Sequence, residues 1–251
     1  MPYEEFASVY DRFMEPEIYD EWVTYLERIF DKHGKKKPKL ILDLACGTGN
    51  ISIRLAKKGY ETIGADLSAD MLKIAKDKAE YNETDILFLQ QDMREFELYG
   101  TVDAVVCMCD SINYLLTPDD VLKVFKLVNN YLDPGGLFIF DINTPYKFEH
   151  VLSDNSFAEV DENMAYIWEN YFDEEEKINE YSMHLFLLDE TTGLYQKHEE
   201  LHYEKAYNIE EIKSLLQKAG LKCLDVYDSD NLGKIKNTSE RVFFVAQEKD
   251  K

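Results

Sequence analysis

Along the first 150 residues, apolar positions follow two patterns, one typical of strands and one typical of helices. Short runs of branched apolar residues are typical of buried strands, and longer stretches with apolar residues at helical spacing separate them. Because strands that alternate with helices form right-handed crossovers, we expect a parallel sheet covered on both faces. The pattern predicts strands at residues 40–45, 60–65, 86–90, 102–107 and 137–141, and helices at residues 50–58, 69–80 and 118–131.

One more helical pattern precedes the first strand. Within residues 17–30, apolar side chains recur at Ile18, Trp22 and Leu26, the spacing of one helix face. We expect this helix to pack on the main domain or to cap its ligand cleft.

The rhythm changes after residue 141. Three aromatic-rich stretches with polar turns between them, at residues 165–172, 178–188 and 194–207, predict antiparallel strands. They follow the carboxyl end of the fifth strand, where parallel sheets bind ligands, so we expect them to form a lid. A helix at residues 210–219 and strands at residues 221–227 and 241–247 complete the pattern. The expected divisions are an N-terminal helical cap (residues 1–35), an α/β core (36–150), an antiparallel lid (151–207) and the end of the core (208–251).

Composition narrows the class of protein. A chain of 251 residues can form one large α/β domain with an insertion. Its four cysteines lack the spacing of a secreted disulfide framework, the first residues are acidic, and no apolar run approaches eighteen residues. These features predict a cytoplasmic protein with reduced thiols. The net charge of −22 argues against nucleic acids and anionic membranes as partners. It favours a neutral or cationic small molecule.

The turn after the first strand carries the clearest chemical signal. Glycines at Gly47 and Gly49 let the backbone approach a ligand, and the following helix presents unpaired N–H groups. A pyrophosphate at this turn would be repelled by the carboxylate of Asp43. Asp43 suits a ligand that has no phosphate and a cationic amino-acid end, and S-adenosylmethionine has both properties.

A second carboxylate follows about twenty residues downstream, where such an acid can accept ribose hydroxyls. This residue, Asp66, ends the second apolar run. Three later segments, Gln91–Met93, Val102–Tyr114 and Asp133–Gly136, occur in the order found in the class I S-adenosylmethionine-dependent methyltransferases. The chain resembles this family. In their residues, the segments Gln91–Phe96 and Cys107–Ser111 are most similar to the small-molecule N-methyltransferases of this family.

The resemblance implies a fold and a cofactor site. The fold is a doubly wound, seven-stranded, mostly parallel Rossmann-like sheet, here with a small antiparallel insertion. In the family, the residue at Asp92 meets the adenine amino group, and the residue at Met93 packs on the ring. Ala45 replaces the usual first glycine, which should narrow the turn without closing it. The implied cofactor-binding residues are Tyr10, Asp43, Ala45, Gly47, Gly49, Asp66, Leu67, Met71, Asp92, Met93 and Cys109.

Candidates for the acceptor side come from the loop after the fourth strand and from the lid. Asp110 and Tyr114 lie in that loop, and His198 is the candidate proton acceptor from the lid. Two-residue alternation places His198, Glu200 and His202 on one strand face, which could mimic a metal site. Methyl transfer in this family needs no metal, so we expect none.

These observations predict an enzyme that transfers a methyl group in line from S-adenosylmethionine to a small molecule, with nitrogen the favoured acceptor atom. Two alternatives stay open: a regulatory protein that binds S-adenosylmethionine without turnover, and an RNA methyltransferase that gains a basic surface from a partner. Oxygen or carbon as the acceptor atom, and a monomer or a homodimer, also remain open from sequence alone.

Overall fold

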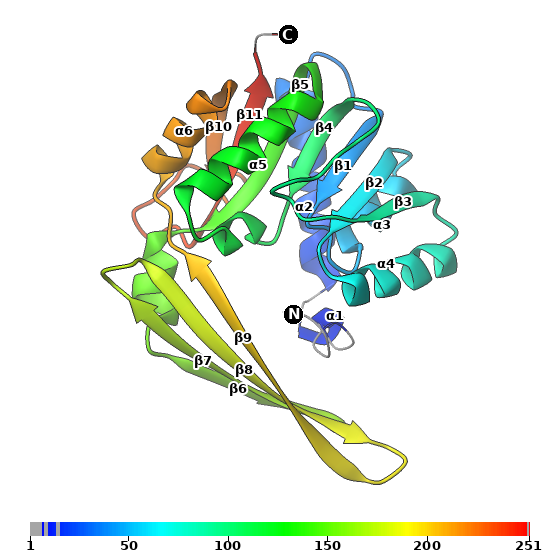
Figure 1. The fold of residues 1–251 in the computed structure, drawn as a ribbon, viewed down its shortest axis with the longest axis vertical. Coiled ribbons are helices and arrows are strands. Elements are labelled where there is room, and N and C mark those ends of the chain that lie inside the picture. The colour runs from blue at the N-terminus through cyan, green and yellow to red at the C-terminus, as the bar shows by residue number, and fades with distance from the viewer. Residues whose placement is uncertain (1–6, 8–9, 14–15, 250) are drawn as a thin grey trace.

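The structure is a computed structural model that describes residues 7, 10–13, 16–249 and 251. Most of the N-terminal segment before residue 10 lies outside these residues. Seven strands form the main sheet in the order β10-β11-β5-β4-β1-β2-β3 (Figure 1). They are β1 (Leu40–Leu44), β2 (Glu61–Asp66), β3 (Ile86–Gln90), β4 (Val102–Cys107), β5 (Leu132–Asn143), β10 (Leu221–Asp228) and β11 (Arg241–Glu248).

The sheet is parallel from β3 to β5, and β11 pairs antiparallel with both β5 and β10. The predicted seven-stranded, mostly parallel sheet is therefore confirmed. The chain leaves β1 for β2 on one side, whereas β4 flanks β1 on the other side. This switch point opens a crevice at the carboxyl ends of the strands.

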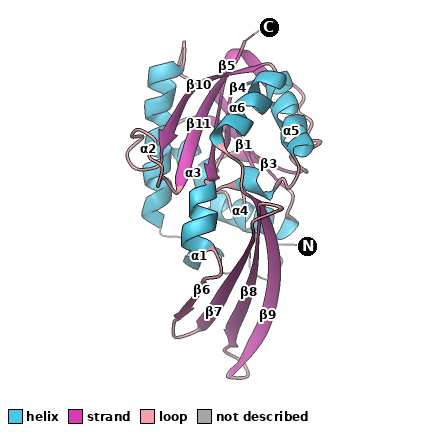
Figure 2. Ribbon diagram, turned by 90° about the vertical axis from the view of Figure 1, so that its left-hand side faces the viewer, coloured by secondary structure: helices cyan, strands magenta, loops and turns pink. Residues whose placement is uncertain are grey.

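Helices cover both faces of the main sheet (Figure 2). On one face, α2 packs with α3 over the sheet, and α4 packs on α3 and β3. On the other face, α5 and α6 pack over β4, β5 and β11. The helices are the short α1 (Tyr10–Phe13), α2 (Pro16–His33), α3 (Asn50–Lys57), α4 (Ala69–Tyr81), α5 (Pro118–Tyr131) and α6 (Ile209–Lys218).

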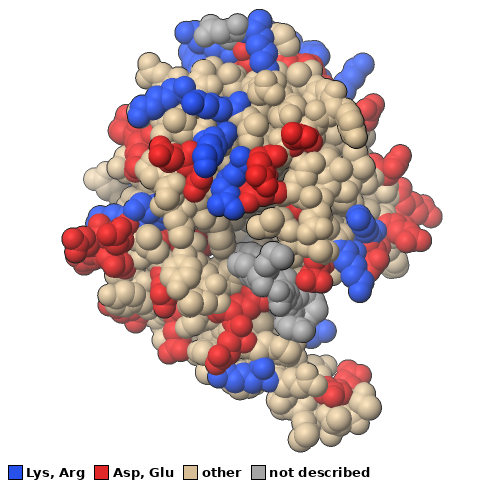
Figure 3. Space-filling view, viewed as in Figure 1, with Lys and Arg blue, Asp and Glu red and all other residues tan. Residues whose placement is uncertain are grey.

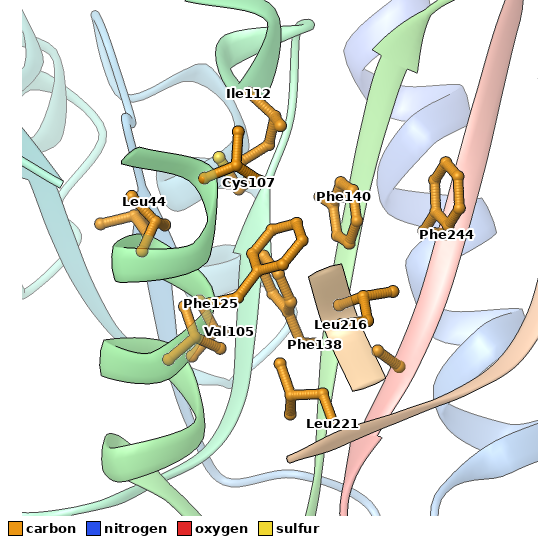
Figure 4. Packing of buried hydrophobic residues seen from close by; sticks show 14 of the residues in the cluster. Leu44, Val105, Cys107, Ile112, Phe125, Phe138, Phe140, Leu216, Leu221 and Phe244 are labelled. Carbon is orange, nitrogen blue, oxygen red and sulfur yellow. The ribbon is translucent and has the colours of Figure 1, made fainter. Parts of the chain in front are cut away.

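Aromatic rings form the centre of the core under α5 (Figure 4). The ring centroid of Phe125 lies 5.6 Å from that of Phe138 and 5.3 Å from that of Phe140. Phe140 also stacks on Phe244 of β11 at 5.0 Å. Packed aromatic pairs of this kind add stability beyond the area that they bury, so these contacts anchor β5 to α5 and β11.

A second, antiparallel sheet forms the lid, in the order β6-β7-β8-β9, and projects away from the main domain (Figures 1 and 2). Its strands are β6 (Ser156–Val160), β7 (Met164–Asp173), β8 (Ile178–Asp189) and β9 (Leu194–Lys205). The sequence predicted three of these strands and missed β6, all five residues of which are exposed. A π-helical segment, η3 (Lys147–Leu152), links β5 to this sheet.

Two expectations from composition can be compared with the structure. In the described part of the chain, no helix is long and apolar enough to cross a membrane. All four cysteines are free thiols.

Candidate functional site

A cavity of about 570 Å³ lies at the carboxyl ends of β1, β2 and β4, at the switch point of the sheet. Of the predicted site residues, Gly49, Asp110 and His198 do not line it. Acidic side chains lie on both flanks of the face shown in Figure 3. The predicted residues that line the cavity are Tyr10, Asp43, Ala45, Gly47, Asp66, Leu67, Met71, Asp92, Met93, Cys109 and Tyr114.

The glycine turn uses its two glycines differently. Gly47 has φ +53, and a Cβ built there meets nothing within 4 Å, so its surface is open to a ligand. Gly49 has φ +76, and a Cβ there would lie 3.1 Å from the Ala75 Cβ and 3.3 Å from the Phe88 ring. Gly49 therefore allows α3 to pack closely on α4 and β3. Ala45 also has a left-handed backbone, with φ +59.

Two carboxyls line the cavity, the buried Asp43 and the half-buried Asp66. Asp43 accepts a hydrogen bond from the Ser52 hydroxyl at 2.5 Å, and burial, with the nearby charge of Asp66, raises its pKa to about 7. Asp66 accepts the Gly47 N–H and the Ser68 N–H, one on each oxygen, both at 2.8 Å. Burial raises the pKa of Asp66 although these bonds oppose the shift. Each Asp66 oxygen keeps lone-pair capacity for a ligand hydroxyl.

The start of α4 and the loop after β3 complete this end of the cavity. Ser68 caps α4 by accepting the Met71 N–H at 3.2 Å, which fixes Met71 in the wall. Asp92 is held by Arg94, whose Nε lies 3.0 Å from both carboxylate oxygens. This guanidinium keeps the pKa of Asp92 below its usual range. Arg94 was not among the predicted site residues.

Helix α1 joins the glycine turn to the lid. Tyr10 lines the cavity and packs against the apolar cluster of the lid. Its neighbour Asp11 accepts hydrogen bonds from Thr48 Oγ1 and Asn50 Nδ2 at 2.7 Å each, and from Lys78 Nζ at 2.6 Å. Sequence reasoning missed Asp11, because its partners lie between 37 and 67 residues away along the chain.

The loop after β4 forms the opposite wall. Cys109 and Asp110 are both left-handed, with φ +62 and +51. Burial raises the pKa of the Cys109 thiol well above its usual value, so this thiol stays protonated near neutral pH. Tyr114 lines the cavity, and its hydroxyl hydrogen-bonds the Tyr181 hydroxyl of β8. Asp110 lies behind the wall, 2.8 Å from Arg241 Nη2.

The lid histidines are distributed differently from the expectation. His198 of β9 pairs with Leu185 of β8 and does not line the cavity. His202, also on β9, lies closer to the cavity wall. The His202 ring stacks on Tyr181 at 4.7 Å and meets Tyr114 edge-on at 6.0 Å. Among the described residues, no group of three or more histidine, cysteine or acidic side chains is arranged to hold a metal ion.

Comparisons with known proteins agree with this geometry. A family model described as a methyltransferase domain matches residues 41–136. A protein of Geobacillus sp. (strain WCH70), which its name assigns to the methyltransferases, is 38% identical over 247 residues, covering 98% of this chain and 100% of its own. A crystal structure of an S-adenosylmethionine-dependent methyltransferase from Clostridium acetobutylicum ATCC 824 superposes with a TM-score of 0.88 at 32% identity, covering 99% of both chains.

A third relative is similar over a shorter range. The dTDP-3-amino-3,4,6-trideoxy-alpha-D-glucopyranose N,N-dimethyltransferase of Streptomyces venezuelae is 33% identical over 114 residues, which is 45% of each chain.

Proposed function

Because the chain belongs to the class I S-adenosylmethionine-dependent methyltransferases, we propose that it methylates a nitrogen atom of a small-molecule acceptor. It is an enzyme, and its methyl donor is S-adenosylmethionine. The observation that carries the proposal is the lining of its cavity. Three of its four carboxyl groups, Asp43, Asp66 and Asp92, lie at the carboxyl ends of β1, β2 and β3, and Tyr114 lies in the loop after β4. Among the described lining residues, Arg94 alone is cationic.

The residues at the acidic end fit the donor. The open surface of Gly47 leaves room for a ligand, and the free lone pairs of Asp66 suit a pair of ribose hydroxyls. Asp43 faces the cationic amino-acid end, and Met71 and Met93 supply apolar walls for the adenine. When bound, S-adenosylmethionine supplies a methyl group that is electrophilic because it is attached to a positively charged sulfur.

The residues at the other end orient the acceptor and exclude water. A neutral amine is itself nucleophilic, so most of the rate enhancement comes from holding two reactants in line in a dry site. The Tyr114 oxygen, held by Tyr181, accepts a hydrogen bond from the acceptor N–H. The rings of Tyr10 and Tyr19 line the same cavity on the side of the glycine turn, near Asn50, where they face the cationic end of the donor.

Charge and similarity both favour a small amine over RNA. The net charge of −22 and the acidic side chains on both flanks in Figure 3 would repel the phosphodiester backbone of RNA. The Streptomyces venezuelae relative is named for methylation at nitrogen. Its similarity extends over 114 residues, so it supports the reaction type rather than a particular acceptor.

The proposal is tested by incubating the protein with radiolabelled S-adenosylmethionine and separate panels of amines, amino sugars, phenols and bulk RNA. We expect label in amines or amino sugars, and none with the Gly47→Val variant, whose side chain would occupy the donor site. Label that enters only RNA, or only phenols, would overturn the proposal.

A further inference from the structure

Strand β9 contacts the acceptor-side loop, residues 110–114, at both ends of the loop. At its start, the Asp110 carboxyl lies within hydrogen-bonding reach of the buried carboxyl of Glu204. Near its end, Asn113 Nδ2 donates to the Lys205 carbonyl at 2.8 Å. The loop that supplies Tyr114 to the cavity is therefore docked on the last residues of the lid.

A third contact lies at Tyr114 itself. Its hydroxyl bonds Tyr181 of β8, and its ring meets the edge of His202, which precedes Glu204 by two residues and shares its strand face. The side chain of His202 is fully buried, and its Nε2 lies 3.0 Å from a Glu200 oxygen. The lid thus holds both the start of the loop and its cavity-facing tyrosine.

The contact between Asp110 and Glu204 lies within a buried cluster of charges. Arg241 bonds Asp110 at 2.8 Å and also bonds Asp141, and Lys147 is close enough to influence both Asp110 and Glu204. Three carboxyls therefore surround two cations. Glu204 is only 4% exposed, so water does not screen the excess negative charge.

The hydrogen bond between two carboxyls fixes the proton count. An ionised carboxylate only accepts hydrogen bonds, so a bond between Asp110 and Glu204 requires a proton on one of them. Asp110 already accepts from Arg241 Nη2 and from Asn143 Nδ2 at 2.9 Å, which favours its ionised form. Burial accordingly raises the pKa of Glu204 well above its usual value. Burial also acts to raise the pKa of Asp110, but the positive charges of Arg241 and Lys147 outweigh it, and the pKa of Asp110 is lowered.

We propose that Glu204 is a positioning residue that acts as a neutral carboxylic acid, donating a hydrogen bond to Asp110 and thereby fixing the acceptor-side loop against the lid. The role of the loop in binding the acceptor rests on the proposed function. The protonation state of Glu204 does not, and it can be tested without any acceptor.

A pH dependence follows. The charged groups that act on Glu204 directly are Asp110, Lys147 and Arg241. The buried Asp141 binds Arg241, the exposed Glu240 acts on Lys147, and His202 shares the strand face of Glu204. When Glu204 loses its proton at alkaline pH, three carboxylates oppose the two cations and the hydrogen bond to Asp110 is lost. We expect the loop to loosen and the acceptor KM to rise, while binding of S-adenosylmethionine is unchanged.

The experiment compares Glu204→Gln with Glu204→Ala in the full-length enzyme between pH 6 and pH 10. Glutamine keeps a donor to Asp110 but cannot ionise. We expect Glu204→Gln to match the wild-type KM at pH 7 and to exceed the wild-type kcat/KM increasingly as the pH rises. Glu204→Ala should raise the acceptor KM about tenfold at neutral pH, the effect of one lost hydrogen bond to a charged group. If Glu204→Gln fails like Glu204→Ala at pH 7, an ionised Glu204 is required and the proposal is wrong.

Amide hydrogen exchange of residues 110–114 gives a second readout that needs no acceptor. After correction for intrinsic rates, protection should fall at alkaline pH in the wild type and persist in Glu204→Gln. Equal protection in the wild type and both variants at every pH would contradict the proposal. If the exchange result holds but no amine is methylated, the proposed acceptor class fails and the role of Glu204 stands.

Discussion

Lys78 Nζ lies 2.6 Å from Asp11 Oδ2, and this ion pair joins α1 to α4 beside the glycine turn. Asp11 also accepts hydrogen bonds from Thr48 of the turn and Asn50 of α3. One carboxylate therefore connects α1 to three parts of the donor end of the cavity. This contact fixes the position of Tyr10, the preceding residue of α1, in the cavity wall.

Asp11→Asn should weaken binding of S-adenosylmethionine about fivefold, because it removes one charged hydrogen bond of about 1 kcal/mol from a partly exposed network. Lys78→Met should have a similar effect, and the double variant should be little worse than either single variant. Calorimetric titration measures all three. Lys76→Met, on the exposed side of α4, is the matched control, and an unchanged affinity in Asp11→Asn would contradict the role of this contact.

The raised pKa of Asp43 predicts how stability varies with pH. The unfolded chain releases this proton near pH 4, whereas the folded protein keeps it until about pH 7. The folded state binds the extra proton between these values, so stability of the ligand-free protein falls as the pH rises from 4 to 7, by up to about 4 kcal/mol. Asp43→Asn should flatten this part of the stability curve, measured by urea unfolding, whereas the exposed control Asp85→Asn should not.

The affinity for S-adenosylmethionine should depend on the same Asp43 proton, but it should increase as the pH rises. A cationic ligand favours ionised Asp43, so the affinity for S-adenosylmethionine should rise between pH 6 and pH 8 and proton release should accompany binding. Titrations in two buffers of different ionisation enthalpy detect that release. In Asp43→Asn we expect weaker and pH-independent binding; a wild-type pH profile in that variant would show that another group titrates.

The two glycines of the turn should respond differently to alanine. Gly49→Ala forces a Cβ against Ala75 and Phe88 at φ +76, which should cost about 2–4 kcal/mol of stability. Gly47→Ala meets nothing within 4 Å in the protein and should cost only about 1 kcal/mol, but its methyl group occupies donor space. Denaturant unfolding should therefore show the larger loss for Gly49→Ala, and calorimetry the larger loss of affinity for Gly47→Ala. The reverse order would show that the two roles are exchanged.

Ala45 offers a stabilising change. Its left-handed backbone, φ +59, costs about 1–2 kcal/mol for alanine, whereas glycine adopts it freely and loses about 0.5–1 kcal/mol of unfolded-state entropy. Ala45→Gly should therefore raise the free energy of unfolding by about 0.5 kcal/mol. Ala56→Gly, within α3, is the control and should lower it by about 1 kcal/mol. A loss in Ala45→Gly as large as that of the control would mean that the strain is absent.

Local pattern was sufficient for the main sheet. The strand predicted at residues 86–90 is β3 and the helix at residues 118–131 is α5, because a short apolar run is typical of a strand and apolar residues at helical spacing are typical of a helix. The strand β6 was missed, since its residues are all exposed and have no apolar face to reveal them. It exists through its pairing with β7.

The acceptor side could be predicted only in part. Tyr114 lies in the cavity wall, as the motif suggested, but Asp110 turns away to Arg241, which is 131 residues distant along the chain. His198 and His202 share one face of β9, so the sequence pattern does not distinguish them. Only the packing of β9 against the loop after β4 shows that His202 lies beside Tyr114. No spacing rule connects residues whose contact depends on how two sheets join.

The sequence by itself determined the α/β fold and the acidic donor end of the cavity, because strand periodicity, the glycine turn and the carboxylates that end β1 and β2 are all encoded in short segments. Only the tertiary structure decided that Gly49 serves packing, that Asp11 anchors α1, and that Glu204 meets Asp110. These contacts join segments far apart in the chain. The energy of their charges depends on how deeply they are buried, and no local sequence pattern shows burial of this kind.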